Sequence, residues 1–209
     1  GRDVLVDLLY GLQAAKRGEI RIDGRRQAIR SPRQAIKAGM ALVPRDRRHQ
    51  GLILSFSAAD NINLASLPET ARFGWERRQL AENKAREWIE RLSIRPAKPA
   101  LPVRFMSGGN QQKVILARWL GTAARLFILD EPTLGVDIGA RSDIYQRTRQ
   151  LAEQGRAVLV SSSDAAELLG LCDRILVMWR GSLAMSLSTR CFNMAALLAA
   201  IYGGQDSQK

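Results

Sequence analysis

The sequence is poor in the residues that hold disulfides and metals. Its 209 residues include two cysteines, Cys172 and Cys191, and a single histidine, His49. Two cysteines are too few for a disulfide framework, and no cysteine or histidine cluster has the spacing of a zinc site. These shortages exclude a disulfide-stapled fold and a zinc finger, and they suit a chain that works in a reducing cytosol.

Long hydrophobic runs are also missing. The longest uninterrupted apolar run covers residues 194–202, far short of the roughly 20 residues that a membrane-spanning helix needs. No segment with a basic, an apolar and a small-residue part opens the chain as a signal peptide would. Because 46% of the residues are hydrophobic, the chain can still bury a core. We therefore expect one soluble domain.

Acidic residues are outnumbered by basic ones, 20 against 32, which gives a formal net charge of +12. Such a charge can attract nucleic acid. The arginines are spread from Arg17 to Arg190, however, without a basic helix or interleaved aromatic residues on which bases could stack. The composition therefore disfavours nucleic acid as a partner. Solvated faces explain the charge, as does attraction to the anionic inner leaflet of a membrane.

Short apolar, β-branched runs alternate with helical patterns, which predicts an α/β fold with a mostly parallel sheet. The runs that predict strands are residues 40–43, 126–130, 157–160 and 175–178. Turn signals at Asp23-Gly24 and at residues 180–182 predict antiparallel edge strands. One of these edges is residues 19–22, and the other is a hairpin of residues 175–179 and 183–185.

The strand pattern stops between residues 57 and 122. Five apolar side chains there recur at helical spacing, namely Ala81, Ala85, Trp88, Ile89 and Leu92. Prolines at positions 96, 99 and 102 then break the chain, and a last helix is expected from near Asn110. We expect one domain over residues 1–209, with an inserted α-helical lobe at about 58–122.

A hydroxyl and two glycines stand directly before that last helix, in the segment Ser107-Gly108-Gly109-Asn110-Gln111. Glycines let backbone N–H groups approach a phosphate, the helix N-terminus adds partial positive charge, and Ser107 supplies one more donor. The segment is therefore a candidate anion site. A plain helix start with Ser107 as its N-cap accounts for the same pattern equally well.

Two carboxylates follow a buried strand at its carboxyl end, as Asp130-Glu131 before Pro132-Thr133. Ligands bind at the carboxyl ends of strands in open parallel sheets. Asp130 would hold Mg²⁺, directly or through water, and Glu131 would polarise the water that attacks a γ-phosphate. The alternative is a solvated acidic strand end.

In this order and separation, the two segments resemble the signature and Walker B motifs of ABC ATPases. Residues 41–46 resemble the strand and start of the Q-loop, residues 135–137 the D-loop, and residues 161–164 the segment of the switch histidine. The resemblance runs almost end to end. It implies the P-loop NTPase-like α/β core of an ABC ATPase, with ATP and Mg²⁺ as ligands.

Residues 108–114 and 131–140 look most like the second cassette of monosaccharide importers. The resemblance implies a role in uptake of a sugar or related solute, at the cytoplasmic, inner face of the cell membrane. The implied partners are a second ABC cassette, transmembrane permease subunits and, indirectly, a solute-binding protein. Related importers of nucleosides and of a furanosyl signalling molecule share much of the pattern, so the solute stays open.

Several positions depart from the pattern of an active ABC site. Gly1, Arg2 and Asp3 align with the Gly-Lys-Ser/Thr end of the phosphate loop, Arg45 replaces the Gln or Glu of the Q-loop, and Ser163 replaces the switch histidine. The planar fork of Arg2 is no substitute for a compact ammonium. Asp3 brings negative charge toward a triphosphate, and Ser163 cannot titrate near neutral pH. With only the end of the loop present, no phosphate cradle is expected.

These departures predict an asymmetric role, in which the signature turn completes an ATP site held by a partner cassette. Turnover is expected from the assembled transporter and not from this chain alone. The predicted catalytic residues are Glu131 and Ser163, and the predicted metal ligand is Asp130. The predicted nucleotide contacts are Gly1, Arg2, Asp3, Arg45, Ser107, Gly108, Gly109, Asn110, Gln111 and Asp137.

Residues 45–56 and the helical lobe are expected to form the cleft that receives a cytoplasmic helix of the permease. Exposed side chains there would be Leu52, Ile53, Leu54 and Phe56, although burial inside the domain accounts for them equally well. Two alternatives to a transport role remain. One is a non-transport ABC protein that acts on nucleic acid or the ribosome, and the other is a non-enzymatic cassette remnant.

Overall fold

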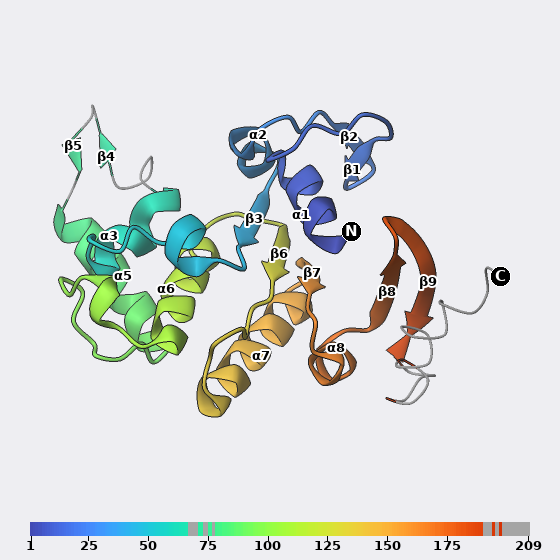
Figure 1. Ribbon diagram of the computed structural model, residues 1–209. Helices are drawn as coiled ribbons and strands as arrows, with labels where there is room; N and C mark the ends of the chain where they lie inside the picture. Colours follow the sequence, from blue (N-terminus) through green and yellow to red (C-terminus); the bar gives the residue numbers. More distant parts are fainter. Residues whose placement is uncertain (67–70, 73–74, 77, 190–193, 195–196, 198–209) are drawn as a thin grey trace. The chain divides into compact units, whose positions relative to one another are not determined.

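The computed structural model describes residues 1–66, 71–72, 75–76, 78–189, 194 and 197 (Figure 1). The chain divides into two compact units. The larger unit is Gly39–Val158, and the smaller unit combines Gly1–Ala38 with Leu159–Lys209.

A pair of parallel strands forms the centre of the larger unit. Strand β3 (Met40–Val43) pairs in parallel with β6 (Leu126–Asp130), and β7 (Ala157–Ser161) follows β6 in the strand order. All four residues of β3 and the last four of β6 are buried. Burial on both faces explains why these strands are continuous apolar runs, because neither face needs polar residues. Three of the four predicted strand runs are thereby confirmed.

Helices make up the segment between β3 and β6. They include α3 (Ala58–Asn63), a 3-10 turn at Leu64–Ser66, α5 (Arg78–Arg91), a 3-10 turn at Val103–Phe105, and α6 (Gly108–Leu120). Helix α5 buries Ala81, Ala85 and Ile89 on one face, as their spacing predicts. Helix α3 starts with a capping box in which Ser57 and Asp60 satisfy each other's backbone N–H groups.

A short antiparallel pair within this segment was not predicted. Strands β4 (Ala71–Arg72) and β5 (Trp75–Glu76) are two residues long each. Pairs of two residues are too short to leave an alternating pattern in the sequence. Helix α7 (Ile138–Glu153) follows β6 and connects it to β7, as the crossover between parallel strands requires.

The smaller unit contains two antiparallel hairpins. Strands β1 (Ile20–Ile22) and β2 (Arg25–Gln27) meet at Asp23 and Gly24, which both have left-handed backbone angles. Strands β8 (Arg174–Trp179) and β9 (Ser182–Ser188) meet at Arg180 and Gly181 in the same way. Two successive residues at positive φ are typical of the type I′ hairpin turn, which confirms both predicted edges.

The pairing of β8 is that of the predicted hairpin of residues 175–179 and 183–185. Within the described residues, β8 pairs with β9 alone, and the sheet of β3, β6 and β7 has three strands. One face of this hairpin packs Ile175, Val177 and Leu187 against the short helix α8 (Ala165–Leu171). The rest of the unit is α1 (Arg2–Tyr10) and α2 (Pro32–Lys37).

In the part of the chain that the structure describes, every helix is too short or too polar to cross a membrane. Of the apolar run at residues 194–202, all but residues 194 and 197 lie outside the described residues.

Candidate functional site

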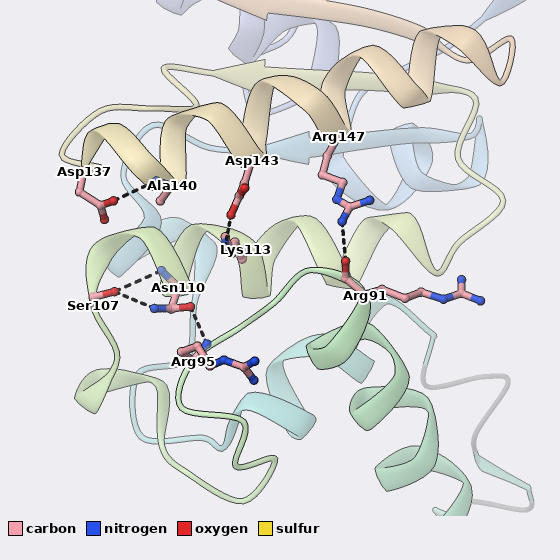
Figure 2. Close-up of polar contacts among 9 residues, drawn as sticks. All are labelled: Arg91, Arg95, Ser107, Asn110, Lys113, Asp137, Ala140, Asp143 and Arg147. Carbon is pink, nitrogen blue, oxygen red and sulfur yellow. Dashed lines mark hydrogen bonds and ion pairs between the residues drawn. The ribbon is translucent and has the colours of Figure 1, made fainter.

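The signature turn is the N-terminus of α6, which begins at Gly108 with Ser107 as its N-cap. The hydroxyl oxygen of Ser107 accepts hydrogen bonds from the backbone N–H of Asn110 and, at 2.9 Å, from its side-chain amide (Figure 2). The side-chain carbonyl of Asn110 accepts from the Arg95 N–H at 2.7 Å. A hydroxyl has one donor and two acceptor positions. These contacts use Ser107 as an acceptor, so its O–H remains suited to donate to a ligand from an exposed position.

The two glycines of this turn are required by packing within the chain. A Cβ atom on Gly108 would lie 2.6 Å from Nη2 of Arg47 and 2.8 Å from the carbonyl oxygen of Gly135. On Gly109 it would lie 2.7 Å from the Cβ of Ala140. Distances this short cannot be accommodated without displacing the segment that follows β6. The sequence suggested that these glycines let a phosphate approach the backbone. The structure adds that they also allow residues 135–140 to pack closely against the start of α6.

Two of the predicted nucleotide contacts also bind partners within the chain. Gln111 is buried and donates from its amide to the Val103 carbonyl at 3.0 Å. Asp137 is the N-cap of α7 and accepts from the Ala140 N–H at 2.9 Å (Figure 2). Each therefore positions backbone around the turn, and their contacts with a nucleotide stay a prediction.

Helix α7 is tied to α6 by an ion pair and to the end of α5 by a hydrogen bond. The ammonium of Lys113 lies 2.6 Å from the carboxylate of Asp143, and the guanidinium of Arg147 donates to the Arg91 carbonyl at 2.6 Å (Figure 2). The Lys113 side chain is only 9% exposed, so the carboxylate of Asp143 offsets the cost of burying its positive charge. The ion pair fixes the helix that carries the signature turn against the helix that follows the D-loop.

The Walker B carboxylates are both buried. Asp130 ends β6 with 8% of its surface exposed, and Glu131 follows with 6% exposed and a φ of 48°. A non-glycine residue in the left-handed region costs of order 1 kcal/mol or more. The turn continues with hydrogen bonds from Leu134 N–H to the Glu131 carbonyl and from Val136 N–H to the Thr133 carbonyl. These bonds hold the two carboxylates at the strand end, as the sequence predicted.

The positively charged side chain of Arg45 lies next to Glu131. Nη2 of Arg45 is 3.8 Å from Oε1 of Glu131, and the Arg45 side chain is 42% exposed. A buried carboxylate without positive charge or hydrogen bonds nearby would be costly. The residue that replaces the usual Q-loop side chain therefore contributes directly to the electrostatics at the predicted catalytic position.

The carboxylates suit Mg²⁺ that arrives with a nucleotide. Mg²⁺ is usually held by one or two carboxylates together with substrate phosphates and water. Asp130 offers such an oxygen at the strand end. Among the described residues there is no group of three or more His, Cys, Asp or Glu side chains that could form a complete protein cage for a metal ion.

The segment that follows β3 is a π-helical turn at Arg47–Gly51, capped by Asp46. The Asp46 carboxylate accepts from the backbone N–H groups of Arg48 and His49, each at 3.1 Å, and lies 2.8 Å from Nδ1 of His49. These contacts, chiefly the hydrogen bonds from the backbone and ring of His49, hold the pKa of Asp46 below its ordinary value of 3.8.

The lowered pKa predicts how this cap responds to pH. A carboxyl group whose pKa is depressed on folding contributes stability that is complete above its unfolded pKa and lost as pH falls through its folded pKa. We expect the carboxyl carbon of Asp46 to titrate below pH 3.8 in an NMR titration. In the variant His49→Gln, which keeps the backbone donor, the midpoint should rise part of the way back. A midpoint at or above 3.8 in the unmodified chain would contradict the capping contacts.

Arg47 is the residue of this region that the sequence did not reveal. Its guanidinium donates to the carbonyls of Leu134 at 2.6 Å and Gly135 at 3.3 Å. These partners are 87 and 88 residues away in the chain. No local pattern marks such a contact, because it depends on β3 and β6 being neighbours in the sheet.

The remaining predicted site residues belong to the smaller unit. Gly1 is the N-cap of α1, and Nε of Arg2 lies 3.6 Å from Oδ1 of Asp3. Ser163 is exposed between β7 and α8. The N-cap of α8 is the next residue, Asp164, which accepts from the backbone N–H groups of Ala166 and Glu167.

Part of the predicted permease contact is exposed. Ile53 and Phe56 are 40% and 45% exposed, whereas Leu52 is 7% exposed and belongs to the core, the alternative that the sequence left open for it. Phe105 was not predicted and is 64% exposed. Its segment pairs with that of Phe56, because Val103 N–H donates to the Phe56 carbonyl at 3.0 Å. We call Ile53, Phe56 and Phe105 the apolar lobe patch.

Known proteins resemble the chain over most of its length. The family model described as ABC transporter matches residues 1–134. The ribose import ATP-binding protein RbsA of Pseudomonas putida is 42% identical over 208 residues, which cover 100% of this chain and 41% of that protein. The arabinose import ATP-binding protein AraG of Chromohalobacter salexigens is 46% identical over 184 residues, which cover 88% and 37%. The chain thus spans about two fifths of these relatives.

Solved ATP-binding cassettes share the fold. A dimeric cassette in a post-hydrolysis state with ADP and Pi superposes with a TM-score of 0.75 at 21% identity, covering 92% of this chain and 82% of that chain. The ADP conformation of another ABC transporter cassette gives 0.73 at 17% identity, covering 98% and 81%. This likeness confirms the predicted α/β fold class. With the family model matched over residues 1–134 of 209, the chain belongs to the ABC transporter family.

Proposed function

We propose that this chain is a nucleotide-binding cassette of an ABC importer that couples ATP binding and hydrolysis to uptake of a sugar or a related small solute. The observation that carries the proposal is the junction in the larger unit, where the signature turn packs on the D-loop segment beside Asp130 and Glu131. The names of the ribose and arabinose import relatives supply the solute class. Residues 1–209 would form one cassette, with the lobe at about 58–122.

In this role the signature turn acts on ATP held by another cassette. Ser107 is exposed and keeps an O–H that can donate, while its oxygen is used to organise the turn. The first N–H groups of a helix have no partner within the helix, and the helix dipole adds positive charge there. Phosphate is the natural ligand of such an arrangement. The partner that supplies the ATP is a second ABC cassette.

The chain's own site would bind ATP weakly and hydrolyse it poorly. Asp3 stands where a hydroxyl should meet Mg²⁺, and it lies beside Arg2, whose charge it offsets. Arg45 adds positive charge beside Glu131, the carboxylate that would orient the attacking water. Ser163 can donate a hydrogen bond but cannot titrate as an imidazole does. These substitutions support retention of the signature without full catalytic chemistry.

The apolar lobe patch would contact the transmembrane permease at the inner face of the cell membrane. Exposed large apolar side chains on two paired segments of the lobe are suited to contact an apolar helix face. A solute-binding protein outside the membrane would then act on this cassette only through the permease.

Chemical modification of the signature turn tests the proposal. In an assembled transporter whose chain carries Cys172→Ser and Cys191→Ser, Ser107→Cys should react with a maleimide without nucleotide. Bound ATP should slow that reaction about tenfold or more, because closure of the site buries the side chain. Ser186→Cys, on an exposed position of β9, is the matched control and should react equally with and without ATP. Equal reactivity of Ser107→Cys under both conditions would favour a cassette remnant without transport.

A further inference from the structure

Arg47 lies where three segments of the larger unit meet. It belongs to the turn after β3, it donates to two carbonyls of the segment after β6, and its guanidinium faces the first residue of α6. These three segments are the ones that the proposed function places around a nucleotide.

The two hydrogen bonds of Arg47 match the forked shape of a guanidinium. Nη1 of Arg47 donates to the Leu134 carbonyl and Nη2 donates to the next carbonyl, that of Gly135. A guanidinium is a planar fork of donors and can satisfy two adjacent acceptors at once, whereas an ammonium acts as a single point charge. Hydrogen bonds from a charged donor are also shorter and stronger than neutral ones. Arginine is therefore suited to hold this pair of carbonyls in one arrangement.

Three glycines leave space for close packing here: Gly108 and Gly135 next to the Arg47 guanidinium, and Gly109 next to the segment that follows β6. Cβ atoms on Gly108 and Gly135 would lie 2.6 Å and 3.4 Å from Nη2 of Arg47, and Gly135 has a φ of 65°. Gly109 lets Ala140 pack against the first turn of α6. The arginine and the glycines thus form one packed unit. A shift of the D-loop segment would have to be accompanied by a shift of the signature turn.

We propose that Arg47 is a positioning residue that locks the D-loop turn to the signature turn, so that both meet the partner cassette's ATP in a fixed arrangement. The inference rests on the proposed function. Arg47 does not touch the nucleotide in this scheme. It acts through the carbonyls of Leu134 and Gly135 and through contact with Gly108.

Two substitutions test this role in the assembled transporter. Arg47→Met keeps the length of the side chain but removes all donors, and it should lower kcat for ATP about tenfold or more with KM changed less than about twofold. Arg47→Lys can hold one carbonyl at a time and should give an intermediate kcat. Amide hydrogen exchange at residues 134–140 should speed up in the same order, because the segment loses its anchor. Arg48→Met, at the exposed neighbouring position, should leave all three measurements at their original values.

The outcomes separate this inference from the proposed function. If Ser107→Arg stops turnover but Arg47→Met keeps the original kcat, the inference is wrong and the proposed function stands. Loss of kcat with unchanged exchange at residues 134–140 would also overturn it, as would an equal loss in Arg47→Lys and Arg47→Met. If Ser107→Arg has no effect, the proposed function fails, and unchanged exchange in Arg47→Met then rejects the locking contact as well.

Discussion

Ser107→Arg in the assembled transporter should lower ATP turnover and solute uptake by about 100-fold or more, on the scale of removing one key transition-state donor. Ser107 is exposed at the N-terminus of α6, where the proposed function brings the partner's ATP. The substitution removes the hydroxyl donor and places a long side chain between the two cassettes. The measurement is ATPase activity together with uptake into proteoliposomes that contain the permease and the solute-binding protein.

Three controls define what the loss means. Ser107→Asn keeps both an N-cap and a side-chain donor, so it tests whether the loss comes from the bulk and charge of arginine, and it should leave the chain as stable as the original. Ser186→Arg adds the same charge at an exposed position of β9 and should leave turnover unchanged. Glu131→Gln should lower turnover less than about twofold, because the chain's own site contributes little. Full activity of Ser107→Arg would show that this turn completes no ATP site.

Asn61→Leu should lower the free energy of unfolding by on the order of 3 kcal/mol, because several buried polar groups lose their partners together. Asn61 is fully buried in α3. Its amide donates to the carbonyls of Ile53 and Ser57, and its side-chain oxygen accepts from Ile53 N–H and from the guanidinium of Arg118. Leucine fills a similar volume but forms none of these bonds. Urea unfolding followed by tryptophan fluorescence measures the change, with buried Trp119 in α6 as a reporter.

Asn83→Leu is the matched control for this loss. Asn83 is exposed on α5, where it accepts a hydrogen bond from Gln79 at 3.0 Å. An exposed substitution of this kind should change the free energy of unfolding by less than about 0.5 kcal/mol. Equal effects of the two substitutions would mean that the Asn61 bonds contribute nothing specific to the lobe.

The sequence predicted the elements that depend on neighbouring residues. Buried strands such as β3 and β6 are short apolar runs, and the apolar face of α5 repeats at helical spacing. The N-cap Ser107 and the carboxylates at the end of β6 could be predicted for the same reason, since a helix start and a strand end are local events. These features follow from side-chain periodicity and capping chemistry.

The rest could not be predicted, because it depends on which distant segments meet. The burial of Leu52 and the exposure of Phe105 depend on how residues 52–57 pair with the turn at Val103–Phe105. The order β3-β6-β7 also depends on which strands, far apart in the sequence, come to lie side by side. Periodicity says that a strand forms but not which strand pairs with it.

By itself, the sequence determined the strands, the capped helices and the order of the signature and Walker B segments, because each is encoded within a few adjacent residues. Only the tertiary structure decided that Arg47 meets the carbonyls of Leu134 and Gly135 beside Gly108. It also decided that Arg45 lies next to Glu131. Both contacts arise because β3 and β6 pair in parallel, so the segments that leave their carboxyl ends emerge at the same edge of the sheet.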